Sequence, residues 1–173
     1  MGVTIDELLV ADEPSAWQAA GFTVEGDLCR IGAVRVRLVG RDRGTGVLGW
    51  SLREVPEERL VAGALDGLPT AVSTAPAAEP AEHPLGVTHL DHVVLASPDL
   101  ARTVAALEAV GLDVRRERDT TLGGTPLRQI FFRLGDVVLE LIGSPDATES
   151  GPATVWGLTH TVADIDAAAS LLG

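Results

Sequence analysis

The strongest constraint on the fold of this chain is that the chain repeats itself. Residues 28–40 reappear at 131–143, with arginine, glycine and valine at the same places in both segments. Within this match, Arg37 of the first segment is replaced by Glu140 in the second. A repeat of this length is one supersecondary unit used more than once, so the fold must hold equivalent copies of that unit.

A second match extends the repeat upstream to the first strand of each copy. Residues 5–12 lie on 92–99 at constant offset, which places Ile5 where the second copy has His92. Polar replacements at matched positions are where chemistry could have been added to one copy. His92 and Glu140 are therefore the first candidates for function.

Composition favours a packed globular protein and excludes several functions. The chain has 173 residues, 46% of them hydrophobic, and a formal net charge of −12. That charge opposes binding to nucleic-acid phosphates. The basic residues are all arginine, so no lysine can form a Schiff base or hold a phosphate, and without tyrosine there is no tyrosine acid. Cys29 is the single cysteine, which excludes a disulfide or a thiolate zinc site, and we expect it to be buried.

Nothing in the sequence indicates a membrane or secretory segment. No apolar run reaches about 18 residues, and the start of the chain lacks the basic region of a secretory signal. We therefore expect a cytoplasmic protein whose partners do not include membranes or nucleic acid.

The first copy, residues 1–56, is predicted to be a degenerate βαβββ module. A strand at 3–11 leads into a short helix, with Asp12 as the N-cap candidate. Gly32-Ala33 has the glycine that a type II′ hairpin turn needs. The remaining strands of this copy are expected at 22–26, 27–31, 34–39 and 47–55. Residues 57–87, rich in proline and alanine, are predicted to be a mobile or surface-draped linker with at most a helical turn or two at 57–65.

Residues 88–173 are predicted to contain the second module and the beginning of a third. The expected elements are a strand at 88–97, a helix at 100–110 capped by Asp99, and strands at 112–119, 127–134 and 137–143. A strand at 154–162 and a helix at 165–172 would open an incomplete third module. Either the sequence is truncated after Gly173 or another element covers the resulting open sheet edge. We expect dimerisation or strand exchange at that edge, so a homodimer is predicted. Trp50 and Trp156 occupy related places, which suggests a shared packing role.

A tandem βαβββ unit whose first strand contains Leu-Asp-His-Val-Val-Leu-Ala-Ser-Pro-Asp-Leu resembles the vicinal oxygen chelate superfamily. That group includes glyoxalase I, bleomycin-resistance proteins and extradiol dioxygenases. The resemblance covers residues 88–173, and residues 3–56 share it only through the internal repeat. It implies an α+β fold in which tandem modules form curved mixed or antiparallel sheets with helices on the outer face.

In the family, a divalent metal lies in the cup of the curved sheet, with ligands from the first and last strands of the modules. The resemblance therefore places His92 and Glu140 as metal ligands and catalytic residues, with Fe, Mn, Ni or Zn as the metal. The next first-strand position falls on Gly157, which has no ligand atom. His160 follows three residues later, and this odd spacing points it to the opposite face unless a bulge intervenes.

Hairpin geometry indicates which side chains accompany this pair. If Gly135-Asp136 is a two-residue turn, Phe131 pairs with Glu140 and Arg133 pairs with Val138, and cross-strand partners share a face. The side chains predicted to bind substrate are Phe131, Arg133 and Gln129, together with Arg37 of the first copy. For the arginines of the first copy we also consider a plain solvated face neutralised by acids such as Glu7 and Glu25.

Three functions remain open from the sequence. The first is a metal-dependent lyase, isomerase or dioxygenase acting on a small molecule with vicinal oxygens. The second is a metal-free protein that binds small molecules or sequesters an antibiotic, as bleomycin-resistance proteins do. The third is a degenerate structural module.

Overall fold

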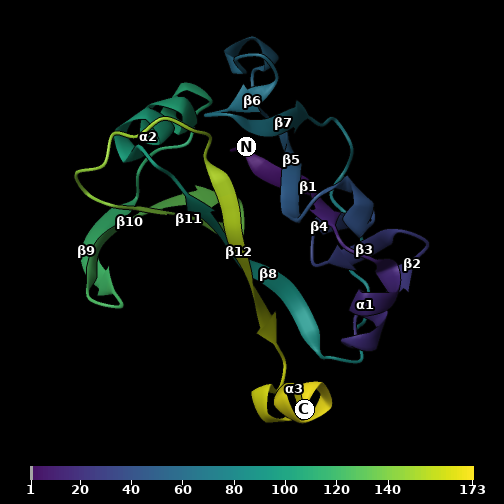
Figure 1. Cartoon of the computed structure of the whole chain (residues 1–173). Coiled ribbons are helices and arrows are strands. Elements are labelled where there is room, and N and C mark those ends of the chain that lie inside the picture. Colours follow the sequence, from purple (N-terminus) through teal and green to yellow (C-terminus); the bar gives the residue numbers. More distant parts are fainter. Residues whose placement is uncertain (1) are drawn as a thin grey trace.

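The computed structural model describes residues 2–173 and contains two similar sets of elements (Figure 1). The first set is β1 (Thr4–Ala11), α1 (Pro14–Ala19), β2 (Val24–Glu25), β3 (Leu28–Ile31), β4 (Val34–Leu38) and β5 (Gly46–Arg53). The second set is β8 (Val87–Ala96), α2 (Leu100–Ala109), β9 (Arg116–Leu122), β10 (Thr125–Leu134), β11 (Val137–Gly143) and β12 (Thr154–Val162), followed by α3 (Ile165–Leu172). The short helix η1 (Arg41–Arg43) lies within the first set, between β4 and β5. Between the sets lie the short helix η2 (Glu57–Arg59) and the strands β6 (Ala64–Leu65) and β7 (Leu68–Val72).

The sheet has the same arrangement in both halves. Its strands follow the order β2-β3-β4-β1-β5-β12-β8-β11-β10-β9, so each strand of the first copy has a counterpart at the mirrored place in the second. The counterparts β5 and β12 meet in the middle, where Val47 pairs with Val155. The predicted α+β fold, with tandem units in an open curved mixed sheet, is confirmed. The strand and helix predicted after the second module are present, but β12 lies inside the sheet, between β5 and β8.

Strand pairing corrects the sequence match in the first strand of each copy. Leu9 pairs with Arg37 in the first copy, and Val94 pairs with Glu140 in the second. Since Arg37 and Glu140 are counterparts, so are Leu9 and Val94, and two residues earlier so are Glu7 and His92. Matching Ile5 to His92 was therefore wrong by two residues. A shift of two keeps every side chain on its face of a strand, so the apolar pattern does not reveal it.

The tryptophan comparison is also wrong. Trp50 pairs with Leu8, whereas Leu158 pairs with Val93, so Leu158 is the counterpart of Trp50. Trp50 is buried, and its indole N–H donates to Thr70 Oγ1 at 2.8 Å. Trp156, at a bulge of β12, is 67% exposed. The two indoles therefore have different environments.

Helices and the apolar sides of the strands form the core. The face of β10 and β11 predicted to be apolar is buried, with Phe132, Leu139 and Leu141 fully inaccessible. The cap of α2 is as expected, because Asp99 Oδ1 accepts from Arg102 N at 3.0 Å. The cap of α1 is Glu13 rather than Asp12. The Asp12 carboxylate instead accepts from the Trp17 indole N–H at 3.2 Å and from Arg41 Nε at 2.7 Å.

The connection between the copies has more regular structure than a draped linker. Strand β7 joins the sheet in parallel to β5, with Thr70 paired to Trp50. Further along, the buried His83 accepts from Thr23 N at Nδ1 and contacts Arg30 O through Nε2, both at 3.0 Å. The linker prediction therefore missed two strands, because backbone groups of this segment pair with each other in β6 and β7 and with the first copy through β5.

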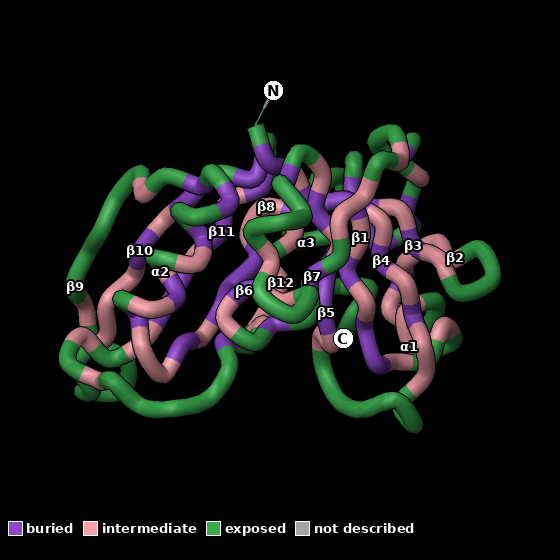
Figure 2. Tube along the Cα trace, turned by 90° about the horizontal axis from the view of Figure 1, so that it is seen from above, coloured by how far each residue is buried: buried purple, intermediate pink, exposed green. Residues whose placement is uncertain are grey.

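Many of the buried residues lie in β1, β4, β8 and β11, whereas the end strand β9 is largely exposed (Figure 2) and β12 has no buried residue. Helix α3 lies at the end of β12 remote from α2 (Figure 1) and has a single buried residue, Ala168. None of the helices in residues 2–173 is long and apolar enough to cross a membrane.

Candidate functional site

The candidate site is the face of the second copy that α2 does not cover, called here the open face. Along β8 and β11 this face carries His92, Val94, Val138 and Glu140, because Val138 pairs with His92 and Glu140 with Val94. The predicted hairpin register is confirmed, since Phe131 pairs with Glu140. The imidazole and the carboxylate therefore share one face of neighbouring strands, and both side chains are half-buried.

The orientation of His92 is set by a bulge in β8. Thr159 of β12 pairs with His92 and His160 pairs with Leu90, so Asp91 has no partner on β12. The Asp91 carboxylate accepts a hydrogen bond from His92 Nδ1. With the proton on Nδ1, the neutral imidazole has its lone pair on Nε2. Nε2 is then the nitrogen available to a ligand, a proton or a metal.

Glu140 is oriented by two residues of the neighbouring strands. Gln129 donates from Nε2 to Glu140 Oε1, and Arg118 Nε donates to Gln129 Oε1 at 2.8 Å. Because Arg118 can only donate, the Gln129 amide oxygen faces it and the amide nitrogen faces the carboxylate. Gln129 thus holds the Glu140 carboxylate in place, and its predicted contact with substrate stays a prediction. The sequence did not indicate Arg118, because its contact depends on the register between β9 and β10.

Phe131 and Arg133 lie where the hairpin geometry placed them. Phe131 is half-buried opposite Glu140, and Arg133 is exposed opposite Val138, which also pairs with His92. The open face thus combines a ring and a guanidinium with the polar pair. Their predicted roles in binding substrate stay predictions.

An apolar hollow continues the open face toward the far end of the strands. It has a volume of about 460 Å³ and is bordered by Ala96, Leu127, Ile142 and Trp156. Ile142 follows Glu140 by two residues on β11, which is a step of about 7 Å along a strand. The exposed indole of Trp156 therefore forms the rim of a hollow next to the polar pair.

Arg37 is paired with acidic side chains of the first copy. It forms ion pairs with Glu7 at 2.9 Å and with Asp27 at 3.0 Å. The hydrogen bond that Arg37 donates to the Glu7 carboxylate raises the pKa of Arg37, because the partner stabilises the charged form. Arg30 is paired with Glu25 in the same way, at 2.8 Å. This surface is therefore a face whose arginines are neutralised by nearby acids, which was the alternative considered from the sequence. The structure does not bring Arg37 to His92 and Glu140.

The open face does not supply a third metal ligand. Gly157 pairs with Val94 and offers no donor. The His160 ring packs edge-on against Phe22 at 5.5 Å, and no bulge returns it to the open face. Burial, and secondarily the nearby His83, lowers the pKa of His160. Within residues 2–173 there is no cluster of three or more histidine, cysteine or acidic side chains able to hold a metal. Catalytic metals usually have three protein ligands, so the residues described do not complete such a site.

Comparison with known proteins agrees with this architecture. Residues 91–172 match the profile of the Glyoxalase/Bleomycin resistance protein/Dioxygenase superfamily. A mutant of 4-hydroxymandelate synthase from Streptomyces coelicolor aligns with a TM-score of 0.60 at 20% identity, over 98% of this chain and 74% of that chain. A catechol 2,3-dioxygenase aligns with a TM-score of 0.60 at 14% identity, over 99% of this chain and 75% of that chain. An extradiol ring-cleaving dioxygenase from B. fuscum has a TM-score of 0.53 at 14% identity, over 99% and 60% of the two chains. At these identities the likeness concerns the fold, and no curated protein matches the sequence.

Proposed function

Because residues 91–172 belong to the glyoxalase, bleomycin-resistance and dioxygenase superfamily, we propose that the open face of the second copy binds a small molecule. This superfamily is the vicinal oxygen chelate group that the sequence resembles. The ligand has an apolar body for the hollow beside Trp156 and an oxygen-bearing group for His92 and Glu140. The observation that carries the proposal is that both polar side chains are held in place by neighbours, Asp91 and Gln129, on a face that ends in an apolar hollow.

The polar pair suits proton transfer as well as binding. His92 Nε2 accepts a proton when Nδ1–H is held by Asp91, and the Glu140 carboxylate accepts hydrogen bonds from hydroxyl groups. A base of this kind can remove a proton from a carbon next to a carbonyl group. Arg133, exposed on the same face, supplies positive charge near the oxygen that becomes negative.

A metal-dependent enzyme of the glyoxalase or dioxygenase type is the second candidate. One observation favours it: the Asp91 carboxylate accepts a hydrogen bond from His92 Nδ1. In metal sites, a histidine that binds the metal through one ring nitrogen usually donates the other N–H to a carboxylate or similar acceptor. Fe, Mn, Ni or Zn would have two protein donors here, His92 and Glu140. A complete centre would need a third donor, either from a segment outside residues 2–173 or from a second subunit of the predicted homodimer.

Ligand binding is tested with a panel of dicarbonyl compounds, catechols and bleomycin-type antibiotics. A ligand of the open face raises the melting temperature and changes the fluorescence of Trp156, and Trp156→Phe removes that fluorescence change. His92→Gln and Glu140→Gln each weaken binding by roughly tenfold or more, since each removes a hydrogen bond to a charged or preoriented group. Glu7→Gln, at the counterpart of His92 in the first copy, is the control and leaves binding unchanged. Ligands that bind both open-face variants as well as they bind the natural sequence would overturn the proposal, as would no binding across the panel.

The metal question is tested separately by metal analysis of protein purified without chelators. A stoichiometric metal that is lost in both His92→Ala and Glu140→Ala would establish the metal-dependent alternative. Metal content that is unchanged in these variants would exclude His92 and Glu140 as ligands. The same two variants thus separate the two candidates.

A further inference from the structure

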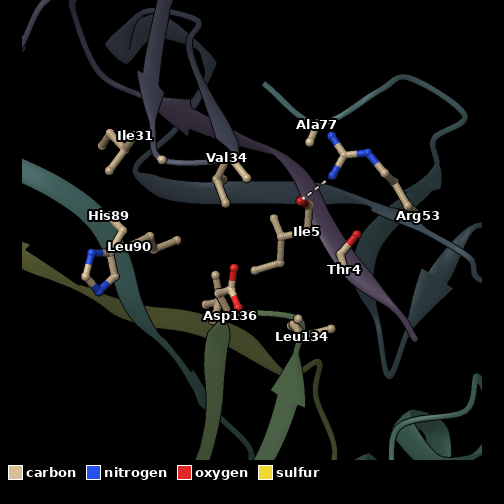
Figure 3. A pocket seen from close by; sticks show the side chains of 14 residues that line it. Thr4, Ile5, Ile31, Val34, Arg53, Ala77, His89, Leu90, Leu134 and Asp136 are labelled. Atoms are coloured by element: carbon tan, nitrogen blue, oxygen red, sulfur yellow. Dashed lines mark hydrogen bonds between the residues drawn. The ribbon is translucent and has the colours of Figure 1, made fainter. Parts of the chain in front are cut away.

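A separate cavity lies between the two copies, at the end of the strands where the hairpin turns lie rather than at the hollow beside Trp156. Its volume is about 430 Å³. Its walls include both hairpin turns, residues 31–34 of the first copy and 134–137 of the second, which are the same four positions of the repeat. The strands β1 and β8 complete it through residues such as Ile5 and Leu90 (Figure 3). The cavity is therefore a product of the way the copies pack.

Each hairpin turn packs against the first strand of the other copy, and the cavity lies between these two contacts. A Cβ on Gly32 would lie 3.2 Å from His89 Cβ on β8, and a Cβ on Gly135 would lie 2.9 Å from Thr4 Cγ2 on β1. Both glycines have positive φ, +57° and +66°, as the first central residue of a type II′ turn requires. Each turn thus approaches the other copy closely, and the space between the turns stays unfilled.

Most of the walls are aliphatic, and the two turns differ in polarity at a single position. Ile5, Ile31, Leu90 and Leu134 are almost completely inaccessible. Where the first turn has Ala33, the second has Asp136. Figure 3 shows the Asp136 carboxylate projecting into the space between Leu90 and Ile5. The repeat has thus placed one acidic group at the mouth of an apolar cavity.

Within residues 2–173, neither an arginine nor the cavity residue His89 forms an ion pair with this carboxylate. Arg53 also lines the cavity, but its guanidinium binds Asp6 and donates to Ile5 O at 2.8 Å and to Ala75 O at 2.7 Å. Asp136 has no ion pair among the described residues. The net charge of −12 adds to the attraction for a cation.

We propose that this cavity binds a small organic cation, a primary amine on a compact hydrocarbon body. The hydrocarbon contacts the aliphatic walls, and the ammonium group donates to the Asp136 carboxylate. The walls exclude water from the body of the ligand, and the carboxylate selects its charge. This site does not depend on the function proposed for His92 and Glu140.

Three probes of the same shape test the proposal: cyclohexylamine, cyclohexanol and cyclohexanecarboxylate. In ¹H–¹⁵N correlation spectra, the amine shifts the amide signals of residues 31–34 and 134–137. The amine binds roughly fivefold more tightly than the alcohol, as expected for a partly exposed ion pair, and the carboxylate binds most weakly.

Asp136→Ala makes the second turn like the first and should abolish the preference for the amine. Asp136→Asn tests the same point without loss of side-chain volume, and Asp113→Asn, at an exposed carboxylate outside the cavity, should leave the preference intact. Equal affinity for amine and alcohol, or an amine preference that survives both Asp136 variants, would overturn the proposal. Absence of shifts at both turns with all three probes would overturn it as well.

Discussion

The two copies of the unit use the same positions of the sheet in opposite ways. In the first copy, the matched positions hold Glu7 and Arg37, which form an ion pair at 2.9 Å. In the second they hold His92 and Glu140, which bind Asp91 and Gln129 instead of each other. In the ion pair, the two opposite charges neutralise each other and serve the structure. The second copy instead keeps an imidazole nitrogen and a carboxylate available on an apolar face, which shows how one scaffold can carry a structural surface and a candidate site.

The largest expected difference concerns the core beneath these faces. Strand pairing makes Cys29 the counterpart of Phe132, and both are fully buried. Phe132→Ala should lower the free energy of unfolding by about 3–5 kcal/mol because it leaves a cavity, whereas Cys29→Ala should cost about 1 kcal/mol. Urea unfolding measures both. Similar losses in the two variants would show that the copies do not pack equivalently.

Burial also raises the pKa of the Cys29 thiol to about 12. The thiol is therefore protonated at neutral pH and is unavailable to a thiol reagent in the folded protein. Its environment is that of a small apolar side chain, which justifies alanine as the matched replacement.

The next difference concerns the bulges in the first strands. Asp6 and Asp91 are counterparts, since each lacks a partner on the adjacent antiparallel strand. The Asp6 side chain is 8% exposed and binds Arg35, Arg53 and Ser73. Asp6→Ala should therefore cost about 3 kcal/mol, because it leaves two largely buried guanidinium groups without their partner.

Asp91→Ala is the matched change in the second copy. The Asp91 side chain is 41% exposed, so its loss should cost less than about 1 kcal/mol. Thermal unfolding of the two variants measures the comparison. An equal loss at Asp91 would mean that its contact with His92 is structural rather than a means of orienting the imidazole.

A smaller effect than that at Asp6 is expected at His160, the counterpart of Leu52 in the first copy. Its Nε2 is buried without a hydrogen-bond partner. His160→Leu should therefore stabilise the protein by about 1–2 kcal/mol, since it removes an unsatisfied polar atom.

The same substitution should reduce the dependence of stability on pH. Burial lowers the pKa of His160 from its ordinary value of 6.5, so below pH 6.5 the unfolded chain binds a proton that the folded chain resists. Proton binding at His160 therefore costs no stability above pH 6.5, and it destabilises the folded protein increasingly as the pH falls toward the lower folded pKa. Urea unfolding at pH 7 and pH 5 tests this, with His89→Gln, at an exposed histidine, as the control. An unchanged pH slope in His160→Leu would show that other groups cause it.

Local signals in the sequence predicted much of the second copy. The register of β10 and β11 followed from one two-residue turn, and it placed Phe131 opposite Glu140. The caps of α2 and α3 followed from Asp99 and Asp164, which accept from the backbone three residues later. These features depend on neighbours in the chain, so residue type and spacing were sufficient.

Contacts between distant segments were not predictable in the same way. The strand β7 lies in a segment whose composition indicated a linker. It was missed because the strand forms through pairing with β5, which is not adjacent to it in the sequence. The orientation of Gln129 depends on Arg118, whose position required the register of β9. The hollow beside Trp156 required the bulge in β12.

The sequence by itself determined the repeat, the alternation of buried and open positions along the strands, and the identity of the polar residues in the second copy. These depend on residue type and on the period of two along a strand. The tertiary structure alone decided which residues of the two first strands correspond, that Arg37 is neutralised by Glu7, and that a cavity separates the hairpin turns. A strand shifted by two residues exposes the same face to water, so only the hydrogen bonds to its neighbours in the sheet could choose between the alternatives.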